Sequence, residues 1–317
     1  MTESLLKDSG FVDLYLGDDY TDIKGMIGAS NRLAPAPETL KTDIENLRQQ
    51  CLNFYHAEKR NEFSIFYGER LYRVTTTVDV YQNIGFVIRQ TPNELFTLQK
   101  VGLSSDLIKL ISQNNNSGLV LVSGKMGAGK TTTAAAMICH RIKESGNLGV
   151  AIEDPIETLL GGKHGDGRCI QLEVSENEGY PLAIKRALRM GANNILIGEI
   201  RDAQTAHEVM KASLNGAFIV ATIHANNCID AIERYSIFCN EINTKANSII
   251  AKSLFIVTNQ VLTPSIYEDN IRGYTCTVNG YDIRANTTIQ AKIRDGNFQT
   301  LKDEFDSINQ KQMRHSL

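Results

Sequence analysis

The sequence lacks any run of about 18 predominantly apolar residues, so we expect no membrane-spanning helix. Its first residues include acids and no apolar segment, which argues against a secretory signal. Tryptophan is absent, proline occurs only six times among 317 residues, and no segment is low in complexity. The composition suggests neither a membrane-spanning helix nor a disordered protein and is ordinary for a globular one, for which this length favours two domains.

Neither sign of charge dominates, because 33 Lys and Arg residues stand against 36 Asp and Glu residues, giving a net charge of −3. A domain that binds duplex nucleic acid is expected to be basic, since it must neutralise phosphates. We therefore expect no direct nucleic-acid partner, and a nucleic-acid motor is disfavoured.

Cysteine spacing excludes another class of protein. The six cysteines lie at positions 51, 139, 169, 228, 239 and 276, and no two of them form a C-x-x-C pair. A structural zinc site of the paired-cysteine kind is therefore not expected, nor is a disulfide framework in a chain this long. We predict a cytoplasmic protein whose reduced thiols are mostly buried.

The first part of the chain has the pattern of a small α+β domain. Apolar residues at helical spacing predict a helix over residues 38–59. Strand-like segments follow at 62–67 and 71–78, joined by a glycine-containing connection that is typical of a hairpin, and again at 84–89. We expect an N-terminal domain over residues 1–90 and a linker over 91–102.

The remainder alternates apolar runs with helical segments, which predicts βαβ units and a mostly parallel sheet. The apolar runs cover residues 119–122, 149–152, 195–197 and 218–222. The helical patterns cover residues 105–113, a long segment that ends near 144, 181–190 and 203–214. After Pro264 we expect strands around 274–278 and at Ile283, then a helix over 297–310. Residues 103–317 are therefore predicted to form an α/β domain with a C-terminal extension.

A phosphate-binding loop follows the first apolar run and fits G-x-x-x-x-G-K-[ST] in full. Its residues are Gly124, Lys125, Met126, Gly127, Ala128, Gly129, Lys130 and Thr131, and we include the next residue, Thr132, in the site. Glycines let the backbone turn tightly and point its N–H groups at phosphate oxygens, and the following helix N-terminus favours negative charge. Lys130 is expected to reach the β- and γ-phosphates, and the Thr131 hydroxyl to ligate Mg²⁺. The motif predicts nucleotide binding, but it does not indicate how the protein uses the energy of the nucleotide.

Acidic residues follow the run 149–152 directly. They are Glu153, Asp154 and Glu157, and Pro155 between them must end the strand because it has no N–H to donate. In open α/β sheets, ligands bind at the carboxyl ends of the strands. One of these carboxylates could orient an attacking water or hold magnesium through water, although a solvated acidic loop is the alternative.

The next strand ends at a second acid, Glu199, which is placed to help hold Mg²⁺. Asp202 suits the N-cap of the helix over 203–214. Arg201 is either a charge partner of the acids or a surface residue, and the sequence leaves both readings open.

Cationic residues form the last group of candidates. His224 follows the strand 218–222 at the same edge, where it is either a γ-phosphate sensor or a structural residue. Lys185 and Arg189 share a helical face, with Arg186 beside them. That face is either solvated or donates positive charge to a nucleotide. Such donation can occur across a subunit boundary, as it does for arginine fingers.

The four motifs together resemble a known family. In order along the chain they are GKMGAGKT, AIEDPIE, ILIGEIRD and ATIHAN. They resemble the Walker A motif, Asp box, Walker B motif and His box of the secretion ATPase superfamily, which drives type IV pili, type II secretion and type IV secretion. The short chain without a C-x-x-C element is most similar to the PilT-like retraction branch. The resemblance implies a PAS-like N-terminal domain, a RecA-like P-loop NTPase domain and a hexameric ring.

The resemblance also implies roles for single residues. Glu157 would be the general base, Glu199 the Walker B acid on Mg²⁺, partly through water, and His224 the sensor of the γ-phosphate. With Lys130 these form the predicted catalytic set. Arg189 matches an arginine of the branch, and Arg73 resembles an N-domain arginine that can approach a neighbour's nucleotide. The first 55 residues and the C-terminal tail match the family poorly.

We therefore predict a hexameric ATPase that uses ATP and Mg²⁺ to power type IV pilus dynamics, with retraction favoured. Its partner would be an inner-membrane platform protein. An ATPase of a type IV secretion or conjugative transfer system is the alternative. A P-loop small-molecule kinase ranks lower because no Arg-rich lid segment is evident, as do a nucleic-acid motor and a scaffold that binds nucleotide without hydrolysing it.

Overall fold

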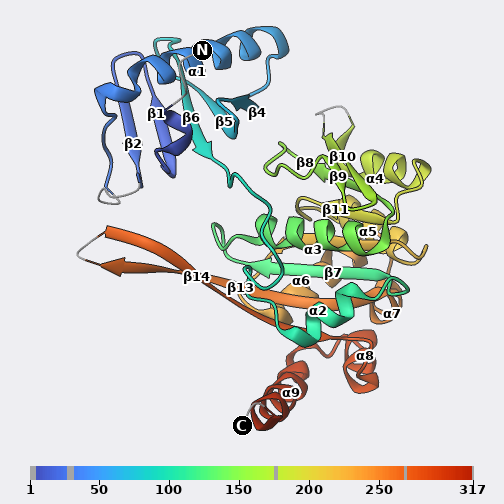
Figure 1. The fold of residues 1–317 in the computed structure, drawn as a ribbon. Coiled ribbons are helices and arrows are strands. Elements are labelled where there is room, and N and C mark those ends of the chain that lie inside the picture. The colour runs from blue at the N-terminus through green and yellow to red at the C-terminus, as the bar shows by residue number, and fades with distance from the viewer. Residues whose placement is uncertain (1–4, 27–31, 175–177, 268–269, 316–317) are drawn as a thin grey trace. The chain divides into compact units, whose positions relative to one another are not determined.

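The computed structural model describes residues 5–26, 32–174, 178–267 and 270–315 (Figure 1). By their contacts the residues form two compact units. The first unit comprises Met1–Glu94, Asp154–Leu159 and Thr263–Thr275, and the second comprises Leu95–Glu153, Leu160–Leu262 and Cys276–Leu317. The segments Asp154–Leu159 and Thr263–Thr275, which follow the start of the second unit in the sequence, therefore belong by their contacts to the first unit.

The first unit is built on an antiparallel sheet with the strand order β3-β2-β1-β6-β5-β4. The strands are β1 (Asp13–Leu16), β2 (Thr21–Lys24), β3 (Ala34–Pro35), β4 (Glu62–Tyr67), β5 (Arg70–Val78) and β6 (Ile84–Gln90). The helices are η1 (Leu6–Asp8), η2 (Glu38–Leu40) and α1 (Lys41–Glu58). The predicted helix and three predicted strands are confirmed, but β1 to β3 were not predicted, because each has four residues or fewer.

The two faces of this sheet differ in polarity because strand side chains alternate between them. On β5, Tyr72 and Val74 are fully buried and pack with Leu47 of α1 in one core. Arg73, between them, lies on the opposite face, as does Ser64 on β4. The face away from α1 therefore carries polar side chains from both strands.

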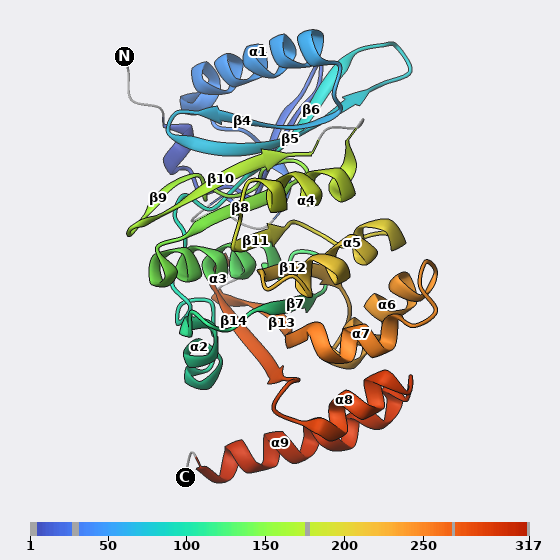
Figure 2. The same cartoon turned by 90° about the vertical axis from the view of Figure 1, so that its right-hand side faces the viewer.

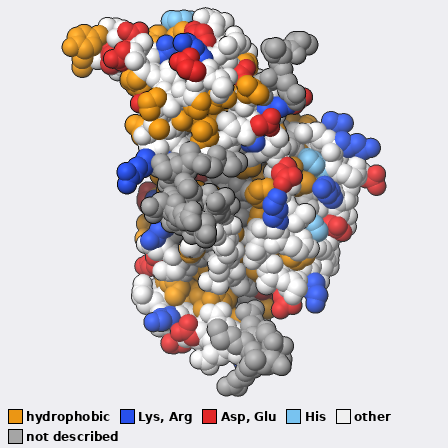
Figure 3. All heavy atoms as spheres, turned by 60° about the vertical axis from the view of Figure 1, so that its left-hand side comes forward, with side chains coloured by type: hydrophobic (Ala, Val, Ile, Leu, Met, Phe, Trp, Pro, Cys, Tyr) orange, Lys and Arg blue, Asp and Glu red, His pale blue; other side chains and the backbone are white. Residues whose placement is uncertain are grey.

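The first unit also exposes large hydrophobic side chains. Val80 and Tyr81 are 87% and 82% exposed on the turn between β5 and β6. Asp79 orders this turn by accepting hydrogen bonds from the backbone N–H groups of Tyr81 and Asn83, both at 2.8 Å. Hydrophobic side chains are visible at the surface of this unit in Figure 3. The turn therefore presents two large apolar side chains to solvent.

The second unit contains an eight-stranded sheet with the order β14-β13-β7-β12-β11-β8-β10-β9. The six neighbouring strands from β13 through β7, β12, β11 and β8 to β10 pair in parallel. Strand β9 pairs antiparallel with β10. The strands are β7 (Gly118–Gly124), β8 (Leu148–Glu153), β9 (Gly162–His164), β10 (Gly167–Glu173), β11 (Asn194–Ile197), β12 (Phe218–His224), β13 (Leu254–Tyr267) and β14 (Asn270–Asp282). The predicted mostly parallel α/β sheet is confirmed, although Ile283 lies just beyond β14.

Helices cover both faces of this sheet (Figure 2). Leu119 and Leu121 of β7 pack with α4 to α9, whereas Val120 and Val122 pack with α2 and α3. The helices are α2 (Ser105–Ser112), α3 (Lys130–Ser145), α4 (Gly179–Arg189), α5 (Ala203–Ser213), α6 (Cys228–Asn240), α7 (Ala246–Ser253), α8 (Thr287–Arg294), η3 (Phe298–Thr300) and α9 (Leu301–His315). The single helix expected over 297–310 is instead the short helix η3 followed by α9, and α8 was not predicted.

The cysteines behave as predicted. All six are unpaired, and all but Cys276 are buried. Burial raises the pKa values of the thiols of Cys51, Cys169, Cys228 and Cys239 to about 12, so these groups stay protonated at neutral pH. Within the described residues, no helix has the length and apolar character that crossing a bilayer requires.

Candidate functional site

The phosphate-binding loop joins β7 to α3 in the second unit. Gly127 and Gly129 have φ values of +72° and +81°, in a region that strains other residues. A Cβ on Gly129 would also lie 2.9 Å from the Gln260 side-chain nitrogen. Gly129 is the residue before α3, so the loop delivers its backbone N–H groups to a helix N-terminus. This is the strand, loop and helix arrangement that the motif predicted.

Polar side chains of β13 fix the loop from the next strand, and the sequence analysis missed them. The Gln260 amide donates a hydrogen bond to the Ala128 carbonyl oxygen. Ser123 Oγ donates to the Thr258 carbonyl oxygen at 2.7 Å, and Asn259 Nδ2 donates to Ser123 Oγ at 3.0 Å. The sequence does contain a signal for this strand, because the apolar run 254–257 is followed at once by three polar residues. The sequence analysis assigned no strand to that run.

Lys130 is held near the strand edge. Its side chain is buried, and Nζ donates a hydrogen bond to the Lys125 carbonyl oxygen at 3.0 Å. Nζ also lies 3.3 Å from His224 Nδ1. Thr131 and Thr132 lie half-buried in the first turn of α3, and Met126 is exposed at the tip of the loop. The structure therefore brings the loop lysine to the predicted sensor histidine.

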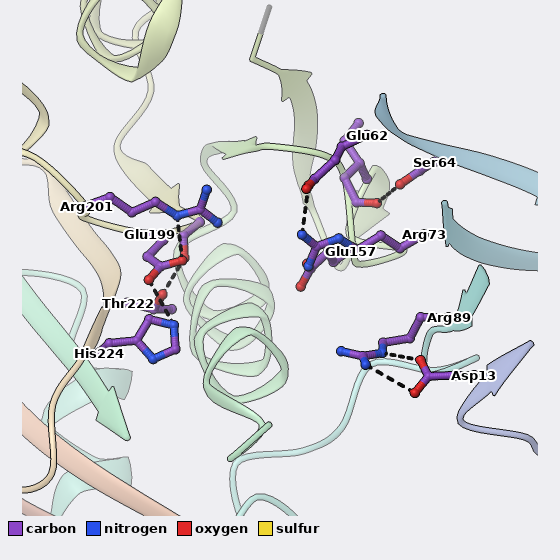
Figure 4. Close-up of polar contacts among 12 residues, drawn as sticks. Asp13, Glu62, Ser64, Arg73, Arg89, Glu157, Glu199, Arg201, Thr222 and His224 are labelled. Carbon is purple, nitrogen blue, oxygen red and sulfur yellow. Dashed lines mark hydrogen bonds and ion pairs between the residues drawn. The ribbon is translucent and has the colours of Figure 1, made fainter. Parts of the chain in front are cut away.

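His224 in turn binds the predicted Walker B acid (Figure 4). His224 Nε2 lies 3.0 Å from Glu199 Oε1, and Arg201 Nε donates to Glu199 Oε2 at 2.8 Å. Glu199 follows β11 and His224 ends β12, so both lie at the carboxyl ends of parallel neighbours. Both readings left open for Arg201 apply, because its side chain is 53% exposed and it is a charge partner of Glu199.

The protonation of His224 follows from its partners. Burial, and then the charge of Lys130, lower its pKa from 6.5, while the charge of Glu199 opposes this. Neutral imidazole suits the geometry, since Nδ1 then accepts from the Lys130 ammonium and Nε2–H donates to Glu199. Arg234 Nη1 fixes the backbone by donating to the His224 carbonyl oxygen at 3.0 Å. A polar chain thus runs from Lys130 through His224 to Glu199.

The acidic segment after β8 is divided between the units. Glu153 is buried in the second unit and accepts a hydrogen bond from Gln171 Nε2 at 2.8 Å. Asp154–Leu159 belongs to the first unit, where Arg73 Nη1 donates to Glu157 Oε1 (Figure 4). The predicted base is therefore paired with a guanidinium of the N-terminal sheet.

The other predicted residues have the following places. Asp202 caps α5, as expected, by accepting from the Thr205 N–H at 2.7 Å. Lys185 forms an ion pair with Glu208 at 3.5 Å. Arg186 pairs with Glu178 at 3.1 Å, and Arg189 is exposed in the last turn of α4. Surface ion pairs therefore account for two residues of the basic face.

The oxygen donors at the site suit magnesium held jointly with phosphates. The described residues contain no cluster of three or more His, Cys, Asp or Glu side chains able to hold a metal. Mg²⁺ prefers oxygen ligands, keeps several waters and usually takes only one or two protein ligands beside phosphate oxygens. The Thr131 hydroxyl and the Glu199 carboxylate fit that role, with Glu199 acting through water because His224 and Arg201 already bind its two oxygens.

The parallel sheet with a phosphate-binding loop defines a RecA-like P-loop NTPase fold, preceded by a small α+β domain. The sequence profile of the type II/IV secretion system protein family matches residues 71–301. The chain belongs to this family, and the resemblance inferred from the four motifs is confirmed.

Curated relatives include two type IV pilus ATPases. The type IV pilus ATPase PilU of Pseudomonas aeruginosa is 30% identical over 244 residues, which cover 73% of this chain and 60% of PilU. The type IV pilus retraction ATPase PilT of the same organism is 32% identical over 186 residues, covering 57% of this chain and 52% of PilT. The matched region thus spans between half and two thirds of each relative.

Solved structures share the fold. The pilus retraction motor PilT with bound ADP has a TM-score of 0.76 at 23% identity, covering 96% of this chain and 89% of PilT. The ATPase DotB of Legionella pneumophila has a TM-score of 0.68 at 16% identity, covering 93% of this chain and 84% of DotB. At these identities the likeness establishes the architecture alone.

Proposed function

We propose that this protein is an ATP-hydrolysing motor that works as a hexameric ring and powers type IV pilus retraction. The observation that carries the proposal is the contact of Lys130 with His224 and of His224 with Glu199, at 3.3 Å and 3.0 Å. It joins three of the four family motifs in one polar chain beside a phosphate-binding loop. A nucleotide γ-phosphate that binds Lys130 would disturb His224, and through it the magnesium-binding acid.

Each residue has a defined task in this proposal. Lys130 and the loop N–H groups bind the β- and γ-phosphates. Thr131 and Glu199 hold Mg²⁺, which would neutralise charge on the transferred phosphoryl group. Glu157 accepts a proton from the attacking water. The remaining predicted nucleotide contacts are Gly124, Lys125, Met126, Gly127, Ala128, Gly129, Thr132, Arg73 and Arg189.

Two relatives support the physiological setting that we propose. The names of PilU and PilT both specify a type IV pilus, which supports a pilus role over the alternative of type IV secretion or conjugative transfer. We propose cytoplasmic rings that reach the inner membrane through a platform protein. The exposed turn with Val80 and Tyr81 supplies apolar surface for such assembly. The division into 1–90, 91–102 and 103–317 is part of the proposal.

The first test is phosphate release by the purified chain together with the mass of its particles. We expect slow hydrolysis of ATP that requires Mg²⁺, and particles of six chains in the presence of nucleotide. Hydrolysis stimulated by single-stranded nucleic acid would instead favour a nucleic-acid motor. Monomers that transfer phosphate only to a small acceptor would favour the kinase.

A further inference from the structure

Gln260 lies beside the phosphate-binding loop, on the strand next to the one that leads into it. It pairs with Gly124 across β13 and β7, and a Cβ on Gly124 would lie 2.7 Å from the Gln260 carbonyl oxygen. Its side chain reaches the other end of the motif, where a Cβ on Gly129 would lie 2.9 Å from Nε2. Gln260 is therefore packed against both the first and the last glycine of the motif.

The side-chain amide of Gln260 fixes the orientation of one peptide group in the loop. Its Nε2 donates a hydrogen bond to the Ala128 carbonyl oxygen, and that carbonyl therefore points toward β13. The peptide bond between Ala128 and Gly129 is trans. In a trans peptide the C=O and the following N–H point to opposite sides within one plane. The N–H of Gly129 therefore points away from Gln260.

The other end of the same amide shows that this contact costs stability. Gln260 is 2% exposed, and its Oε1 is buried without a hydrogen-bond partner among the residues that the structure describes. Only the NH₂ end of an amide can donate to a carbonyl oxygen, so the bond to Ala128 leaves Oε1 in the interior. A buried acceptor without a donor is destabilising, and an apolar side chain of similar size would avoid that cost. This cost indicates a role at the loop rather than in the packing of the core.

We propose that Gln260 is a positioning residue that aims the Gly129 N–H at the β-phosphate of a bound nucleotide. A phosphate-binding loop works by presenting N–H groups to phosphate oxygens, whereas a carbonyl oxygen at the same place repels them. Gly129 has no side chain to restrict its backbone, so without Gln260 this peptide plane is free to rotate. The inference rests on the proposed binding of nucleotide at this loop, and it adds the residue that sets the direction of one N–H.

The test compares nucleotide binding and turnover by the full chain in the wild type and Gln260→Met. Methionine keeps the length of the side chain but has no N–H to donate. Because ADP and ATP both carry a β-phosphate, the affinities for their fluorescent analogues should both fall about tenfold, the effect of one hydrogen bond to a charged group. KM for ATP should rise by a similar factor while kcat stays within about twofold, because the contact is made equally before and during hydrolysis.

Val257→Ala is the matched control on the same strand. Val257 is buried and packs in the core with Leu121, so the substitution leaves a cavity there without changing the loop. It should lower the midpoint of urea unfolding and leave both affinities unchanged.

Three results would overturn the role of Gln260. They are unchanged affinities in Gln260→Met, equal losses of affinity in Val257→Ala and Gln260→Met, and a loss confined to ATP or accompanied by an equal loss of kcat. The last result would mean that Gln260 acts on the γ-phosphate or on the chemical step. Failure of the wild type to bind ADP would instead remove the proposed nucleotide site itself.

Discussion

Glu157→Gln should lower the rate of phosphate release by about 100- to 1,000-fold, the contribution expected of a positioned general base. The amide keeps the shape of the side chain but cannot take a proton from water. The affinity for ATP should change little, since Lys130 and the loop N–H groups supply the phosphate contacts. Single-turnover hydrolysis and analogue binding, measured on the same preparation, would separate the two effects.

The matched control for this prediction is Glu69→Gln. It makes the same chemical change in an exposed acid that forms an ion pair with Lys7, at 3.0 Å, and turnover should match the wild type. Loss of both hydrolysis and binding in Glu157→Gln would indicate that this residue supports the nucleotide site rather than the proton transfer. Unchanged hydrolysis would assign the base elsewhere and reopen the kinase alternative.

The convergence of Lys130, His224 and Glu199 at one edge of the sheet could be anticipated because the alternation of strands and helices is legible in the sequence. Each strand of a parallel sheet ends at the same edge, so polar residues that follow apolar runs converge there. The supports of that edge were not predictable in the same way. Gln260 and Arg234 act through one carbonyl oxygen each, and no spacing rule marks a side chain whose partner is a distant backbone group.

The missed elements have separate causes. β13 begins at Leu254, the residue after the end of α7, with no glycine or proline to mark the change. In the first unit, β1 and β2 have four residues each, too few for a period of two to stand out. The contact of Arg73 with Glu157 joins residues 84 positions apart, and only the folded chain reveals it.

The second large effect is expected for stability. Arg141 of α3 is 3% exposed and donates hydrogen bonds to the backbone carbonyl oxygens of four residues that follow or end α2. They are those of Ile111, Gln113, Asn114 and Asn116, at 3.0, 2.5, 3.3 and 3.1 Å. The guanidinium also lies 4.5 Å from the centre of the Phe218 ring. One side chain therefore holds α2 and the turn after it against α3.

Arg141→Ala should lower the free energy of unfolding by about 3 kcal/mol or more, because it removes hydrogen bonds to a charged group and leaves buried carbonyl oxygens without a donor. The chain has no tryptophan, so urea unfolding followed by far-UV circular dichroism is the suitable measurement. Arg141→Lys keeps the positive charge, but lysine lacks the planar guanidinium that reaches four acceptors. Its loss of unfolding free energy should therefore be smaller than that of Arg141→Ala. Arg294→Ala removes an exposed arginine paired with its neighbour Asp295 and should change stability by less than about 0.5 kcal/mol. Equal midpoints for Arg141→Ala and Arg294→Ala would contradict the idea that α2 depends on Arg141.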